Sequence, residues 1–395
     1  MPARETASTQ QIVPAPAQAL VMRSAALVAR GLRDLSRDSN WLLKKVFNGR
    51  SSRLTVSPTG QVCAVSPLVR QGAESIALYD VELGVPLVAL AVPGIRGDDA
   101  PGKPAAFAWS PSGRHLVAAW GGWPHKLHAF DLNAKMFVGA FDEFKAFPSW
   151  LAWSEAGNYF AASSSGGADS RVRLWDAPTK NANAMPFTEH PAGELVLTDC
   201  STWPEWREGI ASEEQGRSEN GGADTDFADG AAVAGFGRVA FSPDEGGIAC
   251  VVEIEGEWAD DSIAILEVPS LRKQSAFHAQ GHITDLSWTY DSRQIIFCSA
   301  GQASRLAADT MVPEPMPFGA ELCACHPHLP ICLCFSSWLK NSAKGRLFLV
   351  DLRRLKVFDE HAAEGVVDLR WSADGSKAYA VTSDGLAYIY EPPLL

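Results

Sequence analysis

Six residues that can bind soft metal ions lie close together in the last quarter of the chain. They are Cys323, Cys325, His326, His328, Cys332 and Cys334. Thiolate and imidazole groups at such short spacing can hold zinc or copper. The cysteines also alternate along two apolar stretches, where cysteine packs as a small hydrophobic side chain. We expect core packing with no bound cofactor, and a metal site is the alternative.

Acidic residues recur at the ends of seven other alternating stretches. They are Asp80, Asp131, Asp176, Glu267, Asp309, Asp351 and Glu391. A ring of such carboxylates could bind a cation. A carboxylate at the end of a strand also accepts hydrogen bonds from the amides of the following turn. We expect the capping role.

Established catalytic motifs are absent from the sequence. It has no Gly-x-Ser-x-Gly elbow, no phosphate-binding Gly-x4-Gly-Lys-Ser/Thr loop and no His-Glu-x-x-His pair. We therefore predict that the chain is not an enzyme.

A repeated hairpin pattern organises the chain. Each copy has an alternating apolar stretch, a usually aromatic residue, Ser-Pro or a related pair, a turn with Gly or Asp, and a second apolar stretch. The copies span residues 54–66, 107–120, 151–164, 239–252, 286–299, 323–336 and 369–383. The residue before the serine position is aromatic in five of seven copies: Trp109, Trp153, Phe241, Trp288 and Trp371, against Val56 and Cys325.

A third alternating stretch follows each hairpin and ends near one of the acids above. The serine positions are separated by 53, 44, 88, 47, 37 and 46 residues. Most of these gaps lie near the ~40–45-residue period of a four-stranded blade. We predict an all-β, seven-bladed β-propeller of antiparallel four-stranded blades, which excludes parallel α/β folds. The 88-residue gap indicates an insertion, or alternatively an eighth, degenerate blade.

The repeats resemble those of the WD40 family. The stretch Arg171-Val-Arg-Leu-Trp-Asp176 matches the family's terminal Trp-Asp dipeptide, and Gly281-His282 matches its Gly-His opening. The resemblance extends from about residue 50 to the C-terminus. It implies a propeller that binds other proteins, although most of the family's His–Ser/Thr–Asp–Trp hydrogen-bond network is missing here.

The N-terminal segments are expected to have three different roles. Residues 1–18 form a disordered leader, and residues 19–39 form an amphipathic helix that packs on the propeller or on a partner. Residues 40–395 form the propeller, with Asn40 to Phe47 supplying the strand that closes the ring. An acidic, Gly- and Ser-rich insertion lies at about 200–235.

Charge and hydropathy limit the class of partner. The net charge is −12, with an excess of six positive charges in residues 1–55 and −18 in the remainder. An acidic body disfavours nucleic acid as the main partner and favours proteins with basic surfaces or tails. The sequence has no transmembrane segment and no secretory signal, so we expect a cytoplasmic protein.

Tryptophans in the predicted loops are candidates for partner contacts, because large aromatic side chains dominate many protein interfaces. The candidate residues are Trp120, Trp123, His125, Trp203, Trp206, Trp258 and Trp338. We predict a non-catalytic interaction scaffold or adaptor that uses these loops. The alternative is a propeller enzyme, or a sensor of a small molecule or metal, with a site in the central channel.

Overall fold

A computed structural model describes most of the predicted repeat region. The described residues are 41–48, 51–67, 75–92, 104–120, 125–166, 170–177, 191–196, 234–254, 260–337 and 345–392. The predicted leader (1–18) and helix (19–39) lie outside these ranges, as do residues 197–233, which hold most of the predicted insertion. Within the described ranges, no helix is long and apolar enough to cross a membrane.

The described chain folds into strands that run back and forth in sequence order, which confirms the all-β prediction. The first two sheets contain β2 (Ser51–Val56), β3 (Val62–Pro67), β4 (Ser75–Asp80) and β5 (Pro86–Ala91), then β6 (Pro104–Trp109), β7 (His115–Trp120), β8 (His125–Asp131) and β9 (Met136–Phe144). An eight-stranded sheet contains β10 (Phe147–Trp153), β11 (Tyr159–Ser165), β12 (Arg171–Asp176), β13 (Gly193–Val196), β14 (Ala234–Phe241), β15 (Gly247–Ile254), β16 (Ser262–Glu267) and β17 (Lys273–His278). Three further sheets contain β18 (Ile283–Trp288), β19 (Gln294–Ser299), β20 (Gln302–Ala307) and β21 (Pro313–Pro315), then β22 (Leu322–Cys325), β23 (Ile331–Ser336), β24 (Gly345–Asp351) and β25 (Lys356–Ala363), and finally β26 (Val366–Trp371), β27 (Ala378–Thr382), β28 (Leu386–Tyr390) and β1 (Trp41–Lys45).

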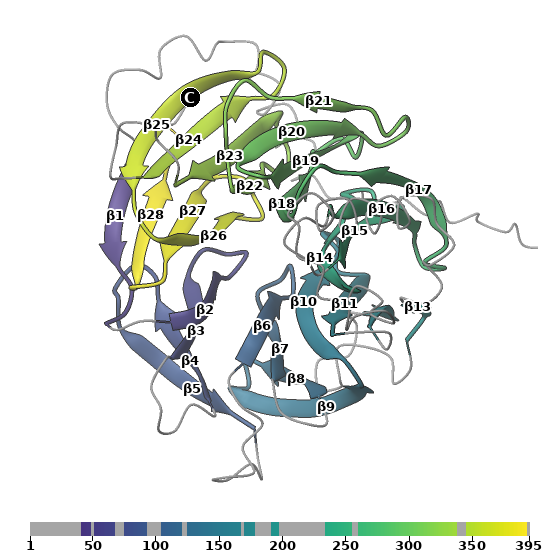
Figure 1. Ribbon diagram of the computed structural model, residues 1–395. Coiled ribbons are helices and arrows are strands. Elements are labelled where there is room, and N and C mark those ends of the chain that lie inside the picture. Colours follow the sequence, from purple (N-terminus) through teal and green to yellow (C-terminus); the bar gives the residue numbers. More distant parts are fainter. Residues whose placement is uncertain are drawn as a thin grey trace, which may run out of the picture.

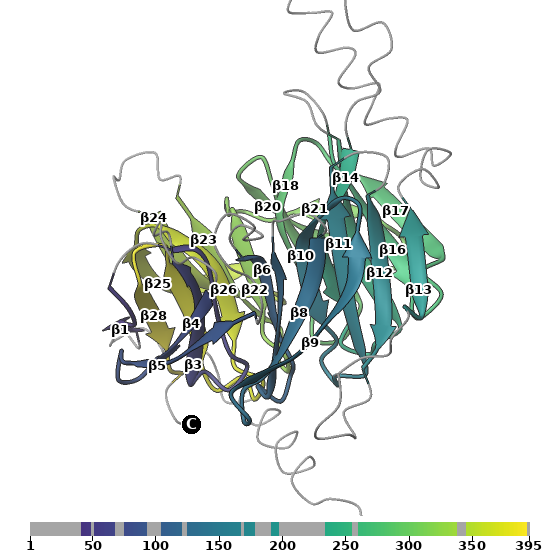
Figure 2. The same ribbon diagram turned by 90° about the horizontal axis from the view of Figure 1, so that it is seen from below.

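These sheets stand around a common centre as the blades of a propeller (Figure 1). The first strand of each blade lies innermost, and β26 contacts β2, so the ring returns to its beginning. Antiparallel order places the turns between first and second strands on one face, which we call the turn face. The connections between second and third strands lie on the opposite face, the loop face. Figure 2 shows the ring edge-on, with the strands running between the two faces.

The last blade is completed by a strand from the other end of the chain. β1 pairs antiparallel with β28, with Trp41 opposite Tyr390 and Lys45 opposite Leu386. This pairing confirms that the predicted segment Asn40 to Phe47 supplies the closing strand, although the strand itself ends at Lys45. It also covers the edge that β28 would otherwise expose.

The eight-stranded sheet consists of two blades that touch directly. β11 and β14 are joined by a single residue pair, Ser165 with Gly235. The Ser163 hydroxyl donates to the Gly237 carbonyl at 2.6 Å, which adds a second link between them. Strands on either side of the 88-residue gap are therefore neighbours in the ring.

The serine of each repeat stabilises the turn that follows it. In six repeats the hydroxyl accepts a hydrogen bond from the amide five residues later; for Ser154 and Tyr159 the distance is 3.0 Å. The other five pairs are Ser57–Val62, Ser110–His115, Ser242–Gly247, Thr289–Gln294 and Ser372–Lys377. In the seventh repeat His326 replaces the serine, and its Nδ1 accepts from the amides of His328 and Leu329.

The aromatic residue before the serine joins adjacent blades. Trp288 Nε1 donates to the Ala240 carbonyl at 2.9 Å, and Trp371 Nε1 donates to the Ala324 carbonyl at 3.0 Å. Trp109 makes the equivalent bond to Thr55 at 3.4 Å. Each acceptor is the residue just before the corresponding position of the preceding blade. The repeat therefore encodes contacts between blades as well as the hairpin itself.

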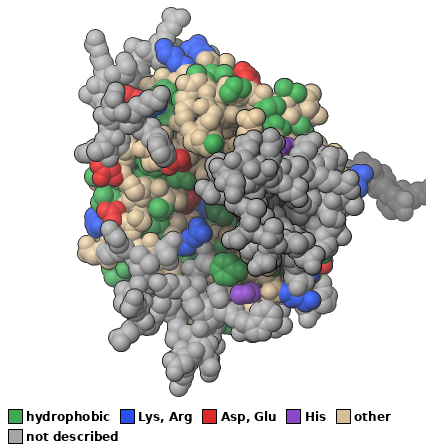
Figure 3. Space-filling view, in the orientation of Figure 1, with side chains coloured by type: hydrophobic (Ala, Val, Ile, Leu, Met, Phe, Trp, Pro, Cys, Tyr) green, Lys and Arg blue, Asp and Glu red, His purple; other side chains and the backbone are tan. Residues whose placement is uncertain are grey.

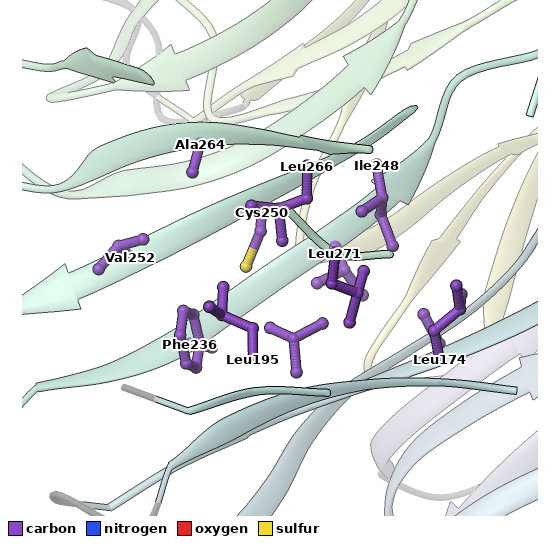
Figure 4. Close-up of a cluster of buried hydrophobic side chains, with 12 residues drawn as sticks. Leu174, Leu195, Phe236, Ile248, Cys250, Val252, Ala264, Leu266 and Leu271 are labelled. Carbon is purple, nitrogen blue, oxygen red and sulfur yellow. The ribbon is translucent and has the colours of Figure 1, made fainter. Parts of the chain in front are cut away.

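Apolar side chains between neighbouring blades form the core. Figure 4 shows Leu174 and Leu195 of one blade facing Phe236, Ile248 and Cys250 of the next, and all five are buried. Buried aliphatic and aromatic groups of this kind supply the main driving force for folding.

Three of the seven acids near the third-strand ends, Asp80, Asp131 and Asp351, accept hydrogen bonds from turn amides, as predicted. Asp131 accepts hydrogen bonds from the amides of Asn133 and Ala134. Asp351 and Asp80 accept equivalent bonds within their own turns. Asp309 differs, because β20 ends two residues before it, at Ala307.

Candidate functional site: the central channel

The innermost strands surround a cavity of about 340 Å³. Its wall includes the inter-blade aromatic residues Trp109, Trp153, Phe241, Trp288 and Trp371. These rings are placed by the hairpin repeat, because each one directly precedes the serine that starts the turn. The indole N–H groups of Trp109, Trp288 and Trp371 already donate to neighbouring blades.

The mouth of this cavity on the turn face is built from one repeat position. The residue after the serine position lines the cavity in all seven repeats: Pro58, Pro111, Glu155, Pro243, Tyr290, Pro327 and Ala373. Five of these seven cannot donate or accept a hydrogen bond through the side chain. Glu155 and Tyr290 are the polar exceptions, so at this repeat position they are the side chains that can form hydrogen bonds with a ligand.

Glu155 is exposed at this mouth, yet its surroundings disfavour its charge. Partial burial raises the pKa of Glu155, the nearby His328 opposes that shift, and Glu245 adds to it. A carboxylate in such surroundings is stabilised when a cation comes close. The mouth can therefore accept a basic side chain between Glu155 and the proline and aromatic surfaces.

A charged group lies deeper in the channel. Arg238 forms an ion pair with the buried Asp285, and its guanidinium lies 4.2 Å from the centre of the Trp150 ring. Burial raises the pKa of Asp285 to about 6, although Arg238 and the Cys323 amide favour the charged form. Arg238 and Asp285 are thus paired with each other.

The structure separates the six candidate metal ligands into two groups. Strand pairing sets Cys323 opposite Cys334 and Cys325 opposite Cys332. Three of them, with Cys298 of the neighbouring blade, belong to one apolar cluster, and Cys325 packs against it. Burial raises the pKa of Cys325 well above its usual value, so this thiol stays protonated.

The two histidines point toward another blade. His326 Nε2 contacts the Gly375 carbonyl at 3.1 Å, and its ring lies 4.6 Å from that of Trp371. His328 Nε2 lies 3.2 Å from the Ala373 carbonyl. Both His326 nitrogens therefore serve backbone groups. Among the described residues, no group of three His, Cys, Asp or Glu side chains is arranged to hold a metal ion.

Most of the predicted partner-binding residues lie outside the described ranges: Trp123, Trp203, Trp206, Trp258 and Trp338. Trp120 is the last residue of β7, and His125 is the first residue of β8. The His125 ring lies edge-on to Phe147 at 5.5 Å. The described side chains visible on the face in Figure 3 mix hydrophobic, basic and acidic types without one of them dominating.

Sequence reasoning did not identify the channel residues Glu155, Tyr290, Arg238 and Asp285. Their signal is positional: the first two directly follow the serine position, and the last two lie three residues before the aromatic position. A charged residue three positions before the aromatic residue is not required by the packing of an apolar inner strand. Comparing each of these two positions across all seven repeats would have identified the four residues as exceptions.

Comparisons with known proteins agree with this geometry. The WD40 family model (WD domain, G-beta repeat) matches residues 145–176, which run from the start of the β10 blade to the Trp175-Asp176 dipeptide. The chain is a β-propeller, and one of its segments matches a WD40 repeat. No curated protein shows significant similarity to its sequence.

Solved structures share the fold of this propeller at low identity. A chain of Kuenenia stuttgartiensis hydrazine synthase aligns with a TM-score of 0.59 and 13% identity, covering 88% of this chain and 97% of that one. A chain of the mitotic checkpoint complex aligns with a TM-score of 0.57 and 14% identity, covering 89% and 94%. The Myceliophteria thermophila Cps50 (Swd1) β-propeller domain aligns with a TM-score of 0.55 and 13% identity, covering 89% and 100%. These likenesses concern the fold alone.

Proposed function

We propose that this WD40-repeat propeller is a cytoplasmic, non-catalytic scaffold of seven blades that binds partner proteins. The observation that carries the proposal is the state of the polar groups in the channel. Arg238 and Asp285 neutralise each other, His326 serves the backbone, and Trp288 and Trp371 bond to adjacent blades. The remaining polar groups, Glu155 and Tyr290, lie at the mouth of the cavity on the turn face, where a partner protein can bind them.

The direct contact across the 88-residue gap supports seven blades. β11 pairs with β14, which favours an insertion over an eighth blade at this point of the ring. Residues 197–233 are then an insertion that connects adjacent blades. This connection leaves the loop face, and its acidic composition adds to the negative charge of the body.

The partner is a protein with a basic surface or tail. One of its Lys or Arg side chains enters the turn-face mouth beside Glu155 and Tyr290. A second contact region is the loop face, where the candidates Trp120, Trp123, His125, Trp203, Trp206, Trp258 and Trp338 belong. Aromatic anchors there would supply apolar area, and the mouth would supply charge recognition.

Affinity capture from native lysate with quantitative mass spectrometry tests this proposal. The baits are the wild type, Glu155→Arg at the mouth, Trp120→Ala/Trp123→Ala on the loop face, and Asp309→Arg as control. Asp309 is exposed in the turn after β20, so its reversal changes the net charge equally without touching the mouth.

We expect a few proteins to bind the wild type and the Asp309→Arg control equally. Glu155→Arg should lower their capture by about tenfold, which corresponds to about 1.4 kcal/mol of lost attraction. If neither the mouth variant nor the loop variant changes capture, both proposed surfaces are wrong.

A further inference from the structure

A second cavity lies in the loop-face half of the central channel. It has a volume of about 80 Å³ and is lined by residues of the inner strands β2, β6, β10 and β26. These strands run from the loop face to the turn face, and the lining residues come before the aromatic position of each. We call this cavity the loop-side pocket. The mouth at Glu155 lies toward the opposite face.

Arg53 brings an unpaired positive charge to the loop-side pocket. It lies three residues before the aromatic position of the first blade. Two residues at the equivalent position of other blades, Arg238 and Asp285, are paired with each other. The Arg53 side chain lines the pocket and forms no ion pair or hydrogen bond with any described residue. The pocket therefore offers a free guanidinium to a ligand.

Arg370 is held in place and still has free donors. Its Nε donates to the Asp368 carboxylate at 3.1 Å, whereas Nη1 and Nη2 donate to none of the described residues. Both residues line the pocket. Guanidinium groups bind planar anions through two parallel N–H donors. The pair with Asp368 thus orients Arg370 and leaves its terminal N–H groups for a ligand.

Thr55 adds a buried hydroxyl to these donors. It is 3% exposed and lines the pocket, and its Oγ1 has no hydrogen-bond partner among the described residues. A buried hydroxyl without a partner destabilises the fold unless a ligand or water binds it. Packing does not require a hydroxyl here, because the equivalent residue is alanine in four other repeats: Ala108, Ala152, Ala240 and Ala324.

The three donors converge from two adjoining blades. Thr55 and Arg53 lie on the same side of β2, because they are two residues apart on one strand. Arg370 belongs to β26, which contacts β2 where the ring closes. Trp150 and Val367 form an apolar part of the wall, and Val367 is 47% exposed. Apolar walls strengthen the attraction between a guanidinium and a bound anion.

Volume and charge limit the ligand to a small monovalent anion. The cavity volume of about 80 Å³ is the space of about two or three water molecules. Arg53, Arg238 and Arg370 in this part of the channel exceed the carboxylates of Asp285 and Asp368 by one positive charge. That excess balances one carboxylate, whereas the second charge of a phosphate would be repelled by Asp368.

We propose that the loop-side pocket binds the carboxylate of a small organic acid. Arg53 and the terminal N–H groups of Arg370 donate to the carboxylate oxygens, and the Thr55 hydroxyl donates a further bond. The carbon end of the acid lies against Trp150 and Val367. This inference does not rest on the proposed protein partner, whose basic side chain enters from the turn face.

Ligand-observed NMR titration of the full-length chain with acetate and propionate, at constant ionic strength, tests this proposal. Arg53→Gln removes the free charge, and Thr55→Val removes the hydroxyl while keeping the shape. The matched control, Arg353→Gln, removes one charge from an exposed turn between β24 and β25, outside the pocket. We expect saturable millimolar binding to the wild type and the control.

Binding should be about tenfold weaker in Arg53→Gln and about threefold weaker in Thr55→Val. Equal binding in the wild type and Arg53→Gln, or no saturable binding at all, would overturn the proposal. Inorganic phosphate is titrated in parallel. Tighter binding of phosphate than of acetate would overturn the assignment to a carboxylate.

A variant that gains affinity guards against misfolding as the cause of these losses. Asp368→Asn releases Arg370 from its carboxylate and makes the pocket more positive. We expect it to bind acetate about threefold more tightly than the wild type does. Circular dichroism checks that each variant is folded. Weaker acetate binding by a folded Asp368→Asn chain would overturn the proposed arrangement of donors.

Discussion

Replacing the tryptophans that join the blades tests how the ring is held together. The same change, Trp to Phe, can be made at Trp288, Trp371 and Trp109. Their indole N–H groups donate to the preceding blade at 2.9, 3.0 and 3.4 Å. Because the loss of ring volume is the same in each case, differences between the variants report on the hydrogen bond.

The expected costs follow from two contributions. The smaller ring removes roughly 1 kcal/mol of apolar burial at every site. Losing a good hydrogen bond and leaving a buried carbonyl unpaired costs about 1–3 kcal/mol more. Trp288→Phe and Trp371→Phe should therefore lose about 2–4 kcal/mol of unfolding free energy. Trp109→Phe should lose about 1 kcal/mol, because its bond is long and weak.

Urea unfolding followed by circular dichroism measures these differences, with thermal unfolding as a check on the order. Burial alone predicts the opposite order from hydrogen bonding, since Trp109 is 3% exposed and Trp288 is 7% exposed. If Trp109→Phe is the most damaging of the three, packing holds the blades together, and our explanation of the aromatic position is wrong.

Three further predictions concern the turns. Ser154→Ala removes the acceptor of the partly buried Tyr159 amide and should cost about 1 kcal/mol of unfolding free energy in urea unfolding. A Cβ at Gly60 would overlap the Tyr379 hydroxyl, whereas a Cβ at Gly113 would have more room. Both glycines have a similar positive φ, so backbone strain is the same in the two variants. Gly60→Ala should therefore lower the melting temperature more than Gly113→Ala does. Burial lowers the pKa of His326 to about 4 in the folded protein. As the pH drops from 6.5 to 4, His326 therefore takes up its proton in the unfolded chain before it does so in the folded protein. Its contribution to the unfolding free energy should fall by about 3 kcal/mol over this range. Urea unfolding of His326→Ser across this range should show a smaller fall, and an equal fall would refute the assignment.

The sequence predicted the architecture well because the fold repeats its local rules. Ser154 and its equivalents mark the turn between the first two strands in six repeats, and the alternating stretches on either side become strands of a hairpin. The segment around Trp41 could be assigned to ring closure, because the last repeat lacks a fourth strand. Each of these inferences needs only the chemistry of a few neighbouring residues.

The channel and its pairings were harder to predict, because they depend on how the blades meet. Arg238 and Asp285 belong to different blades, and nothing in either strand identifies the other as its partner. The Cys323 cluster and His326 are close in sequence, yet the cysteines pack toward one neighbouring blade and the histidine toward the other. Periodicity gives the face on which a side chain lies but not the residues across the ring.

The most direct test of the scaffold account is hydrogen exchange on the propeller bound to the partner that affinity capture identifies. The account predicts slower exchange at the mouth, in the turns at Ser154–Asn158 and Thr289–Arg293, and loss of that protection in Glu155→Arg. Protection confined to outer strands such as β25, with the mouth and the loop face unchanged, would contradict it.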